Sequence, residues 1–182
     1  MFPGESLRHW AEALRAGEVA AAPAEGVYGY CCDPFNETAL RTLMVLKQRD
    51  ASKGLIVLVR SEAQLAGICS PLGAFEQEAI RAWWAPGQPP TTLILPAGEG
   101  LSRLLTGGRG TLAVRCPLVE YMREYLTAWG GPLVSTSLNI GGEAPVTCAG
   151  QIPPNVVALT LAFPLSGTPS RIFDCAGKRW LR

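Results

Sequence analysis

The chain has 182 residues, of which 48% are hydrophobic and 17% are charged. This composition excludes an intrinsically disordered chain and predicts a single domain over residues 1–182. The 16 Lys and Arg residues nearly balance the 15 Asp and Glu residues, so the net charge is only +1. A site for a polyanion would therefore depend on local clusters of cations rather than on the overall field of the protein.

The cysteines form neither a metal-binding nor a disulfide pattern, because two are adjacent and no C-x-x-C pair occurs. They are Cys31, Cys32, Cys69, Cys116, Cys148 and Cys175. We therefore expect reduced cysteines, no metal site and a cytoplasmic location. The polar segment 1–9 lacks the apolar run of a signal peptide, and no segment approaches the roughly 20 apolar residues of a membrane span.

Helices and strands alternate along the first half of the chain. An apolar face predicts a first helix that Ser6 can cap, and Asn36 can cap a second helix that runs to Lys47. The aliphatic run 55–59 is typical of a strand covered on both faces. The sequence also predicts a strand at 18–22, a turn at 33–36 and a short helix opened by a capping box of Ser61 and Gln64.

The second half continues this alternation around a glycine-rich loop at 97–110, whose length is typical of functional loops. The predicted helices are 75–84 and 118–129, and the predicted strands are 91–95, 111–115, 132–136, 156–163 and two short pieces within 171–182. This order predicts an α/β fold with a largely parallel sheet, and it leaves antiparallel strands near the C-terminus open.

Several common catalytic patterns are absent. His9 is the one histidine and lies in the first predicted helix, so Ser/His/Asp and Cys/His mechanisms lack a base. The sequence has no Walker loop, and no G-x-G-x-x-G follows a strand. A nucleotide site in this protein would need another arrangement.

Lys47, Arg49 and Lys53 place three cations between a predicted helix and a predicted buried strand. Lys and Arg can face an anion from several directions, and the planar guanidinium suits phosphate oxygens. Gly54 lets the backbone approach a ligand closely. Basic residues also offset the dipole at helix C-termini. Taken alone, the cluster leaves phosphate binding and simple helix stabilisation equally open.

Hydroxyl and amide side chains follow the predicted strand 132–136. Ser135, Ser137 and Asn139 precede Gly141 and Gly142. At the carboxyl end of a strand such groups can bond phosphate, ribose or a carboxylate. An ordinary polar turn explains this segment equally well, and without other indications it is the preferred interpretation.

Two further segments carry weaker signals. Arg115 ends the predicted strand 111–115, where it could hold a carboxylate through two hydrogen bonds or simply be a surface arginine. The glycine-containing turn 23–29 follows the first predicted strand. The order and spacing of all four segments are more informative than any one of them.

Taken in order, these segments resemble the motifs of the YrdC/TsaC family of threonylcarbamoyl-AMP synthases, over almost the whole chain from residue 17 onwards. The family's P-T-[ED]-x-x-[YF]-G turn is similar to 23–29, K-x-R to 47–49, K-G-L-I to 53–56, A-V-R to 113–115, S-x-S-x-N to 135–139, P-S-[TE]-I to 169–172 and the terminal L-R to 181–182. Each motif is short, but the ordered set is specific.

The resemblance implies a YrdC-like fold, a twisted mixed, largely parallel sheet with helices on its faces and a concave ligand cleft, in the short single-domain form. It implies a nucleotidyltransferase that forms L-threonylcarbamoyladenylate and pyrophosphate from L-threonine, bicarbonate and ATP. ATP with Mg²⁺ would be a substrate, and no tightly bound cofactor is expected. A tRNA-threonylcarbamoyl transferase complex of the TsaD/TsaB/TsaE type would then modify adenosine 37 of tRNA.

The resemblance also assigns roles to individual residues. Lys47 and Arg49 would be catalytic. The threonine-binding residues would be Gly26, Arg115, Ser135 and Ser170. The ATP-binding residues would be Lys47, Arg49, Lys53, Thr111, Ser137, Asn139, Pro145 and Arg182.

The chain departs from the family pattern at a few of these motifs. Ala24 stands where the family's turn has threonine, and Gly26 stands where a second threonine or alanine is common, which would remove side-chain hydrogen bonds from the threonine site. Asp50 stands where proline is usual and could neutralise Arg49, and Arg171 replaces a threonine.

These departures allow an alternative, a diverged paralogue that binds nucleotide or double-stranded RNA in ribosome or RNA maturation without efficient synthesis. The near-neutral charge argues against RNA as the main ligand.

Overall fold

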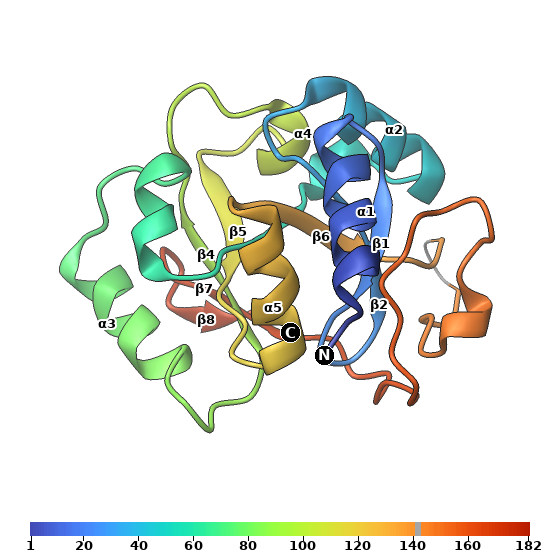
Figure 1. Ribbon diagram of the computed structural model, residues 1–182. Helices are drawn as coiled ribbons and strands as arrows, with labels where there is room; N and C mark the ends of the chain where they lie inside the picture. The colour runs from blue at the N-terminus through green and yellow to red at the C-terminus, as the bar shows by residue number, and fades with distance from the viewer. Residues whose placement is uncertain (141–142) are drawn as a thin grey trace.

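The computed structural model describes residues 1–140 and 143–182, so the expectation for Gly141 and Gly142 lies outside the described residues. Helices cover a single sheet (Figure 1). Its eight strands in the described residues are β1 Ala20–Pro23, β2 Tyr28–Cys32, β3 Ile56–Leu58, β4 Thr91–Pro96, β5 Thr111–Arg115, β6 Leu133–Ser137, β7 Arg171–Asp174 and β8 Arg179–Trp180. Their order across the sheet is β1-β2-β6-β3-β5-β4-β7-β8.

The longer helices lie close to their predicted positions. The α-helices are α1 Gly4–Arg15, α2 Glu37–Lys47, α3 Ala74–Trp83, α4 Arg103–Thr106 and α5 Glu120–Trp129. The 3₁₀ helices are η1 Ala51–Lys53, η2 Glu62–Gly67 and η3 Ala149–Gln151. The short α4, which lies in the expected loop 97–110, and the 3₁₀ helices η1 and η3 were not predicted. No helix in the described parts of the chain is long and apolar enough to cross a bilayer.

The predicted helix caps had mixed outcomes. Asn36 caps α2 as expected, because its side-chain oxygen accepts a hydrogen bond from the backbone N–H of Ala39 at 3.0 Å. The cap at Ser6 is wrong, since α1 already begins at Gly4 after Pro3, whose fixed φ suits the start of a helix. Ser61 precedes η2 but makes no side-chain cap bond there.

One predicted strand is absent from the described residues, and one strand of the structure was not predicted. The segment 156–163 is not a strand in the structure, where a single bridge joins Ala158 to Ala21. The strand β2 was not predicted, although all five of its residues are buried. Its sequence of Tyr, Gly and Cys lacks the aliphatic residues that marked the other strands, and burial in a sheet is set by neighbouring strands.

The sheet is mixed, but it is less parallel than expected. Five of the seven strand pairings in the described residues are antiparallel, and the parallel pairs are β3–β5 and β4–β7. The turn between β1 and β2 is short enough to join only antiparallel neighbours. In addition, β6 lies between β2 and β3 and is antiparallel to both. The alternation of strands and helices along the sequence does not reveal this insertion.

The two faces of the sheet are covered differently. Buried residues of α2 and α3 pack on one face, whereas α1 and α5 lie side by side on the other (Figure 1). Side chains alternate between the faces along β5. Leu112 and Val114 belong to the core beneath α2 and α3, while Thr111, Ala113 and Arg115 line a cavity on the opposite face.

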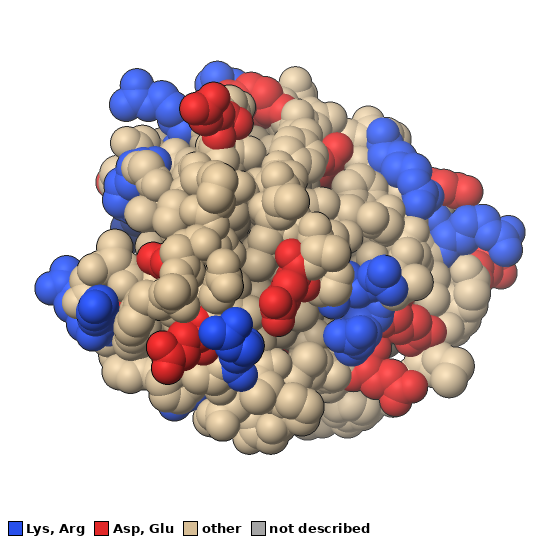
Figure 2. Space-filling view, turned by 90° about the vertical axis from the view of Figure 1, so that its left-hand side faces the viewer, with Lys and Arg blue, Asp and Glu red and all other residues tan. Residues whose placement is uncertain are grey.

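Basic and acidic side chains are interspersed on the side of the molecule where α3 lies (Figure 2). This view agrees with the near balance of charges in the sequence. A concentration of one sign elsewhere would therefore be a local feature.

Candidate functional site

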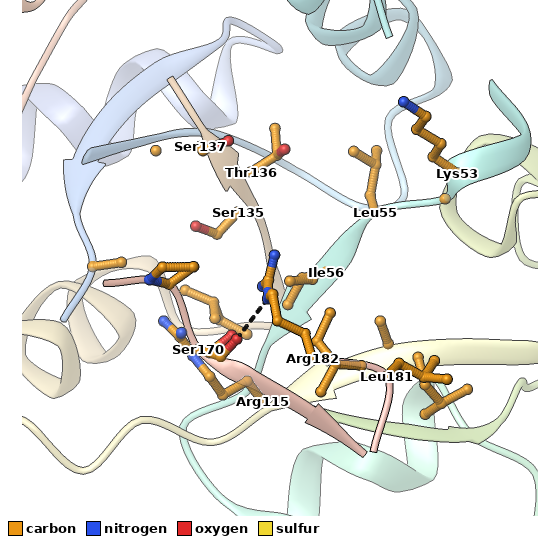
Figure 3. A pocket seen from close by; sticks show the side chains of 18 of the residues that line it. Lys53, Leu55, Ile56, Arg115, Ser135, Thr136, Ser137, Ser170, Leu181 and Arg182 are labelled. Carbon is orange, nitrogen blue, oxygen red and sulfur yellow. Dashed lines mark hydrogen bonds between the residues drawn. The ribbon is translucent and has the colours of Figure 1, made fainter. Parts of the chain in front are cut away.

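A cavity of about 630 Å³ opens on the face of the sheet that bears Arg115. Its walls come from the turn before β2, the segment after α2, strands β3, β5 and β6, and the C-terminal segment (Figure 3). This volume is typical of small-molecule sites. Within the described residues, its charged lining consists of five cations and one carboxylate, namely Arg49, Lys53, Arg109, Arg115, Arg182 and Asp174. The excess of positive charge favours an anionic ligand.

The cavity brings together nine of the twelve residues expected to form the site. All four expected threonine-binding residues line it, together with Arg49, Lys53, Thr111, Ser137 and Arg182 from the expected ATP site. In Figure 3, Arg115, Ser170 and Arg182 gather on one side of the cavity and Lys53 lies on the other. Lys47, Asn139 and Pro145 are not part of the lining.

Lys47 lies behind the wall of the cavity, and only 4% of it is exposed. Its ammonium donates hydrogen bonds to the backbone oxygens of Ser137 and Asn139, the latter at 2.6 Å, and to Ser137 Oγ at 3.2 Å. Burial, and to a smaller extent the nearby charge of Arg49, lowers the pKa of Lys47 to about 8. The ammonium thus ties the end of α2 to the end of β6.

The segment after α2 presents Arg49 to the cavity. Arg49 Nε donates to the backbone oxygen of Gly54 at 2.9 Å, and burial lowers the pKa of its guanidinium. The carboxylate of Asp50 accepts a hydrogen bond from the backbone N–H of Ser52 at 2.8 Å and so caps η1. The ion pairs of the described residues do not include Asp50 with Arg49, so the expected neutralisation is not observed.

Arg109 is a cation of the site that the sequence patterns did not indicate. Its guanidinium donates to the backbone oxygens of Ser52 at 2.7 Å and Lys53 at 3.3 Å. The loop that carries it can lie this close to η1 because two glycines meet there. A Cβ on Gly107 would lie 2.4 Å from the backbone oxygen of Ser52, and one on Gly54 would lie 2.7 Å from that of Leu105. In the sequence, the signal that could have indicated Arg109 was its position as a basic residue in a loop with five glycines.

Arg115 is held by Glu25, another residue not singled out from the sequence. Its Nη2 lies 2.5 Å from Glu25 Oε2, and the arginine is only 6% exposed. Its buried Nε has no hydrogen-bond partner among the described residues. Burial, followed by the charge of Arg115, lowers the pKa of Arg182. Two guanidinium groups thus approach each other beside the hydroxyls of Ser135 and Ser170, as in a site for a carboxylate or phosphate.

Gly26 is required by the close approach of a distant segment. The backbone N–H of Gly167 donates to the oxygen of Gly26 at 2.7 Å. A Cβ on Gly26 would lie 1.8 Å from the backbone oxygen of Thr168, which forbids any larger residue without movement of that segment. A threonine side chain at this position would therefore not fit beside the backbone of 167–168.

Among residues 1–140 and 143–182, no group of three or more His, Cys, Asp and Glu side chains is arranged to hold a metal ion. The chemistry available in the cavity comes from cations, hydroxyls and backbone groups. These groups can bind and align anions and neutralise developing negative charge.

The comparisons with known proteins identify the family of the chain. The family model named Sua5/YciO/YrdC, described as telomere recombination, matches residues 12–181. The chain is 41% identical over 148 residues to threonylcarbamoyl-AMP synthase of Stenotrophomonas maltophilia, covering 80% of this chain and 78% of that protein. An alignment of 191 residues with the Methylococcus capsulatus protein of the same name shows 39% identity and covers 98% and 97%.

Solved structures show the same fold. Sua5 from P. abyssi, crystallised with L-threonine, matches with a TM-score of 0.79 and 28% identity over 92% of this chain, which spans 50% of that protein. E. coli YciO matches with a TM-score of 0.77 and 21% identity, covering 93% of this chain and 84% of that protein. The resemblance read from the motifs is thereby confirmed, and the chain belongs to the Sua5/YciO/YrdC family.

Proposed function

We propose that this chain is a threonylcarbamoyl-AMP synthase, which forms L-threonylcarbamoyladenylate and pyrophosphate from L-threonine, bicarbonate and ATP. One observation carries the proposal: Arg49 and Lys53 share a single cavity with Ser135 and Ser137, although these pairs are far apart in sequence. The names of the relatives with about 40% identity support the same activity.

The side of the cavity around Arg115 is the proposed threonine site. Its guanidinium, oriented by Glu25, suits the carboxylate of an amino acid, and Ser135 and Ser170 add hydroxyl groups. Gly26 lines this side of the cavity as well. The solved complex of P. abyssi Sua5 with L-threonine supports this assignment.

The side of the cavity around Lys53 is the proposed site of the triphosphate. Arg49, Lys53 and Arg109 supply positive charge there, and Mg²⁺ enters with ATP as part of the nucleotide substrate. Thr111, Ser137 and Arg182 line the space between the two sides. Asn139 and Pro145 complete the proposed ATP-binding residues on the segment that follows β6.

The proposed chemistry requires alignment more than covalent participation. The amino group of threonine attacks the carbon of bicarbonate, water leaves, and a carbamate forms. A carbamate oxygen then attacks the α-phosphorus of ATP, the bond from this phosphorus to the bridging oxygen breaks, and pyrophosphate leaves with that electron pair. Arg49 neutralises charge on the phosphates, and Lys47 fixes the end of β6 from behind the wall. Arg49 is thus the proposed catalytic residue that faces the phosphates, and Lys47, the other residue expected to be catalytic, would act by positioning β6.

The proposed setting follows from the same family membership. The enzyme would act in the cytoplasm as a single domain over 1–182, without a tightly bound cofactor or metal site of its own. A tRNA-threonylcarbamoyl transferase complex would take its product for modification of adenosine 37. Nothing observed in the structure favours the paralogue without synthase activity or the RNA-binding module.

An assay of pyrophosphate release tests the proposal. Purified protein with L-threonine, bicarbonate and MgATP should release pyrophosphate, and the adenylate should be detected by mass spectrometry. Reactions without threonine, and an Arg115→Gln variant, serve as controls. Release that does not depend on threonine, or no release above background, would refute the proposed function.

A further inference from the structure

The guanidinium of Arg171 lies over two tryptophan rings that contact each other, next to the cavity. Its guanidinium carbon lies 4.5 Å from the centroid of the Trp180 ring and 5.4 Å from that of Trp83. Its Nη2 also donates to Thr91 Oγ1 at 3.2 Å. These distances are typical of cation–π contacts, which are stronger when the cation is partly desolvated. We call this arrangement the Trp83–Arg171–Trp180 stack.

The stack anchors the short strand β8 to α3 and β7. The Trp180 ring meets that of Trp83 edge to face at 5.0 Å and that of Phe173 at 5.0 Å. Trp180 is nevertheless 41% exposed, and β8 pairs with β7 at only two positions. Backbone hydrogen bonds of Ile172 with Leu181 and Arg182 continue this short pairing. The backbone and the aromatic contacts together therefore set the position of the hairpin.

The opposite face of the same hairpin forms part of the cavity. Ile172, Asp174 and Leu181 line it, together with Arg182 (Figure 3). The backbone N–H of Leu181 donates to the oxygen of Ile172 at 2.8 Å, and Arg182 Nε donates to the backbone oxygen of Ser170 at 3.0 Å. Leu181 and Arg182, which directly follow Trp180, therefore both reach the cavity.

We propose that the Trp83–Arg171–Trp180 stack is a positioning device that holds Arg182 in the nucleotide site. This inference rests on the proposed function, because it assumes that Arg182 contacts ATP. Arg171 and Trp180 act through Arg182 and do not touch the substrate. At position 171, where the family pattern has threonine or glutamate, this chain has an arginine that the two rings and Thr91 Oγ1 hold in place.

A double-mutant cycle on ATP binding tests the device. We expect Trp180→Ala to raise the Kd for ATP, measured by calorimetry, about tenfold, or about 1.4 kcal/mol. In an Arg182→Ala background the same change should raise Kd less than about twofold, because the group that it positions is gone. Trp180→Phe, which keeps an aromatic face for Arg171, should restore most of the affinity.

Lys178→Gln is the matched control on the same hairpin. It removes the contact of this ammonium with the Phe75 ring, 4.7 Å away, but leaves the stack intact, so ATP should bind as to the wild type. If Trp180→Ala does not fold, Arg171→Thr takes its place in the cycle. An unchanged Kd, or an equal loss in both backgrounds, would overturn the positioning role. A wild-type protein that binds no ATP would instead refute the proposed function.

Discussion

The buried ammonium of Lys47 predicts a distinctive dependence of stability on pH. Burial lowers its pKa from 10.5 to about 8, a difference of about 2.5 (10.5 minus 8). Between these two values the unfolded chain binds a proton that the folded chain has lost. The free energy of unfolding should therefore rise with pH in this range, by at most about 1.4 kcal/mol per pH unit and by about 3 kcal/mol in total. Below pH 8 the cost of burying the charge is present in full.

Other buried groups act in the opposite direction. Burial raises the pKa of Cys31 and of Tyr121 to about 12 each. The unfolded chain loses these protons first as the pH rises, so these groups lower the stability at high pH. The effect of Lys47 must therefore be measured as a difference between two proteins that share the other groups.

Lys47→Met supplies that comparison, because it keeps the length of the side chain and removes the charge. We expect the free energy of unfolding of the wild type, minus that of the variant, to increase by about 3 kcal/mol from pH 7.5 to 10.5. Urea unfolding followed by circular dichroism at four pH values measures it. Lys53→Met is the control, since Lys53 is exposed on the cavity lining. A difference that does not change with pH would show that the Lys47 ammonium is hydrated, and would contradict its place behind the wall.

Three other substitutions test the site. Glu25→Gln leaves Arg115 buried without its carboxylate. It should therefore raise the KM for threonine about tenfold and lower the free energy of unfolding by about 1–3 kcal/mol. Steady-state kinetics measures the first effect and urea unfolding the second. Gly26→Ala should destabilise the protein by about 2 kcal/mol or more in thermal unfolding, because the new Cβ would lie 1.8 Å from the backbone oxygen of Thr168. Its control is Gly110→Ala, which has open space around the new Cβ and should change stability by less than about 0.5 kcal/mol. Arg109→Ala should raise the Kd for ATP about tenfold without changing the KM for threonine.

The parts of the fold that could be predicted were those encoded locally. The aliphatic run 55–59 and the segment 111–115 contain the strands β3 and β5, because their side chains alone specify a buried extended segment. By contrast, β2 is buried by its neighbours in the sheet. β1 precedes it through a turn, and β6 is distant in sequence. The antiparallel insertion of β6 is a property of the whole sheet, and no local pattern indicates it.

The same distinction applies to the site. Arg49, Lys53, Arg115 and the serines of β6 could be predicted, because they lie in short motifs whose order is specific. The pairing of Glu25 with Arg115 joins residues 90 positions apart (115 minus 25), and it becomes visible only when the turn before β2 meets the end of β5. Lys47 belonged to a predicted motif, yet its burial behind Ser137 depends on how α2 packs against β6.

The location of the cavity follows from the two-residue period of β5 and β6. Leu112 and Val114 of β5 and Val134 of β6 enter the core beneath α2 and α3. On the other face, Thr111, Arg115, Ser135 and Ser137 line the cavity where α1 and α5 leave the sheet uncovered. Gathering guanidinium groups there costs free energy. Burial lowers the pKa of Arg49, and burial, followed by the charge of Arg115, lowers the pKa of Arg182. Charges held at such a cost are typical of functional sites, where an anionic ligand offsets it. The unbalanced positive charge on this face is therefore the feature that links the fold to the proposed carboxylate and triphosphate ligands.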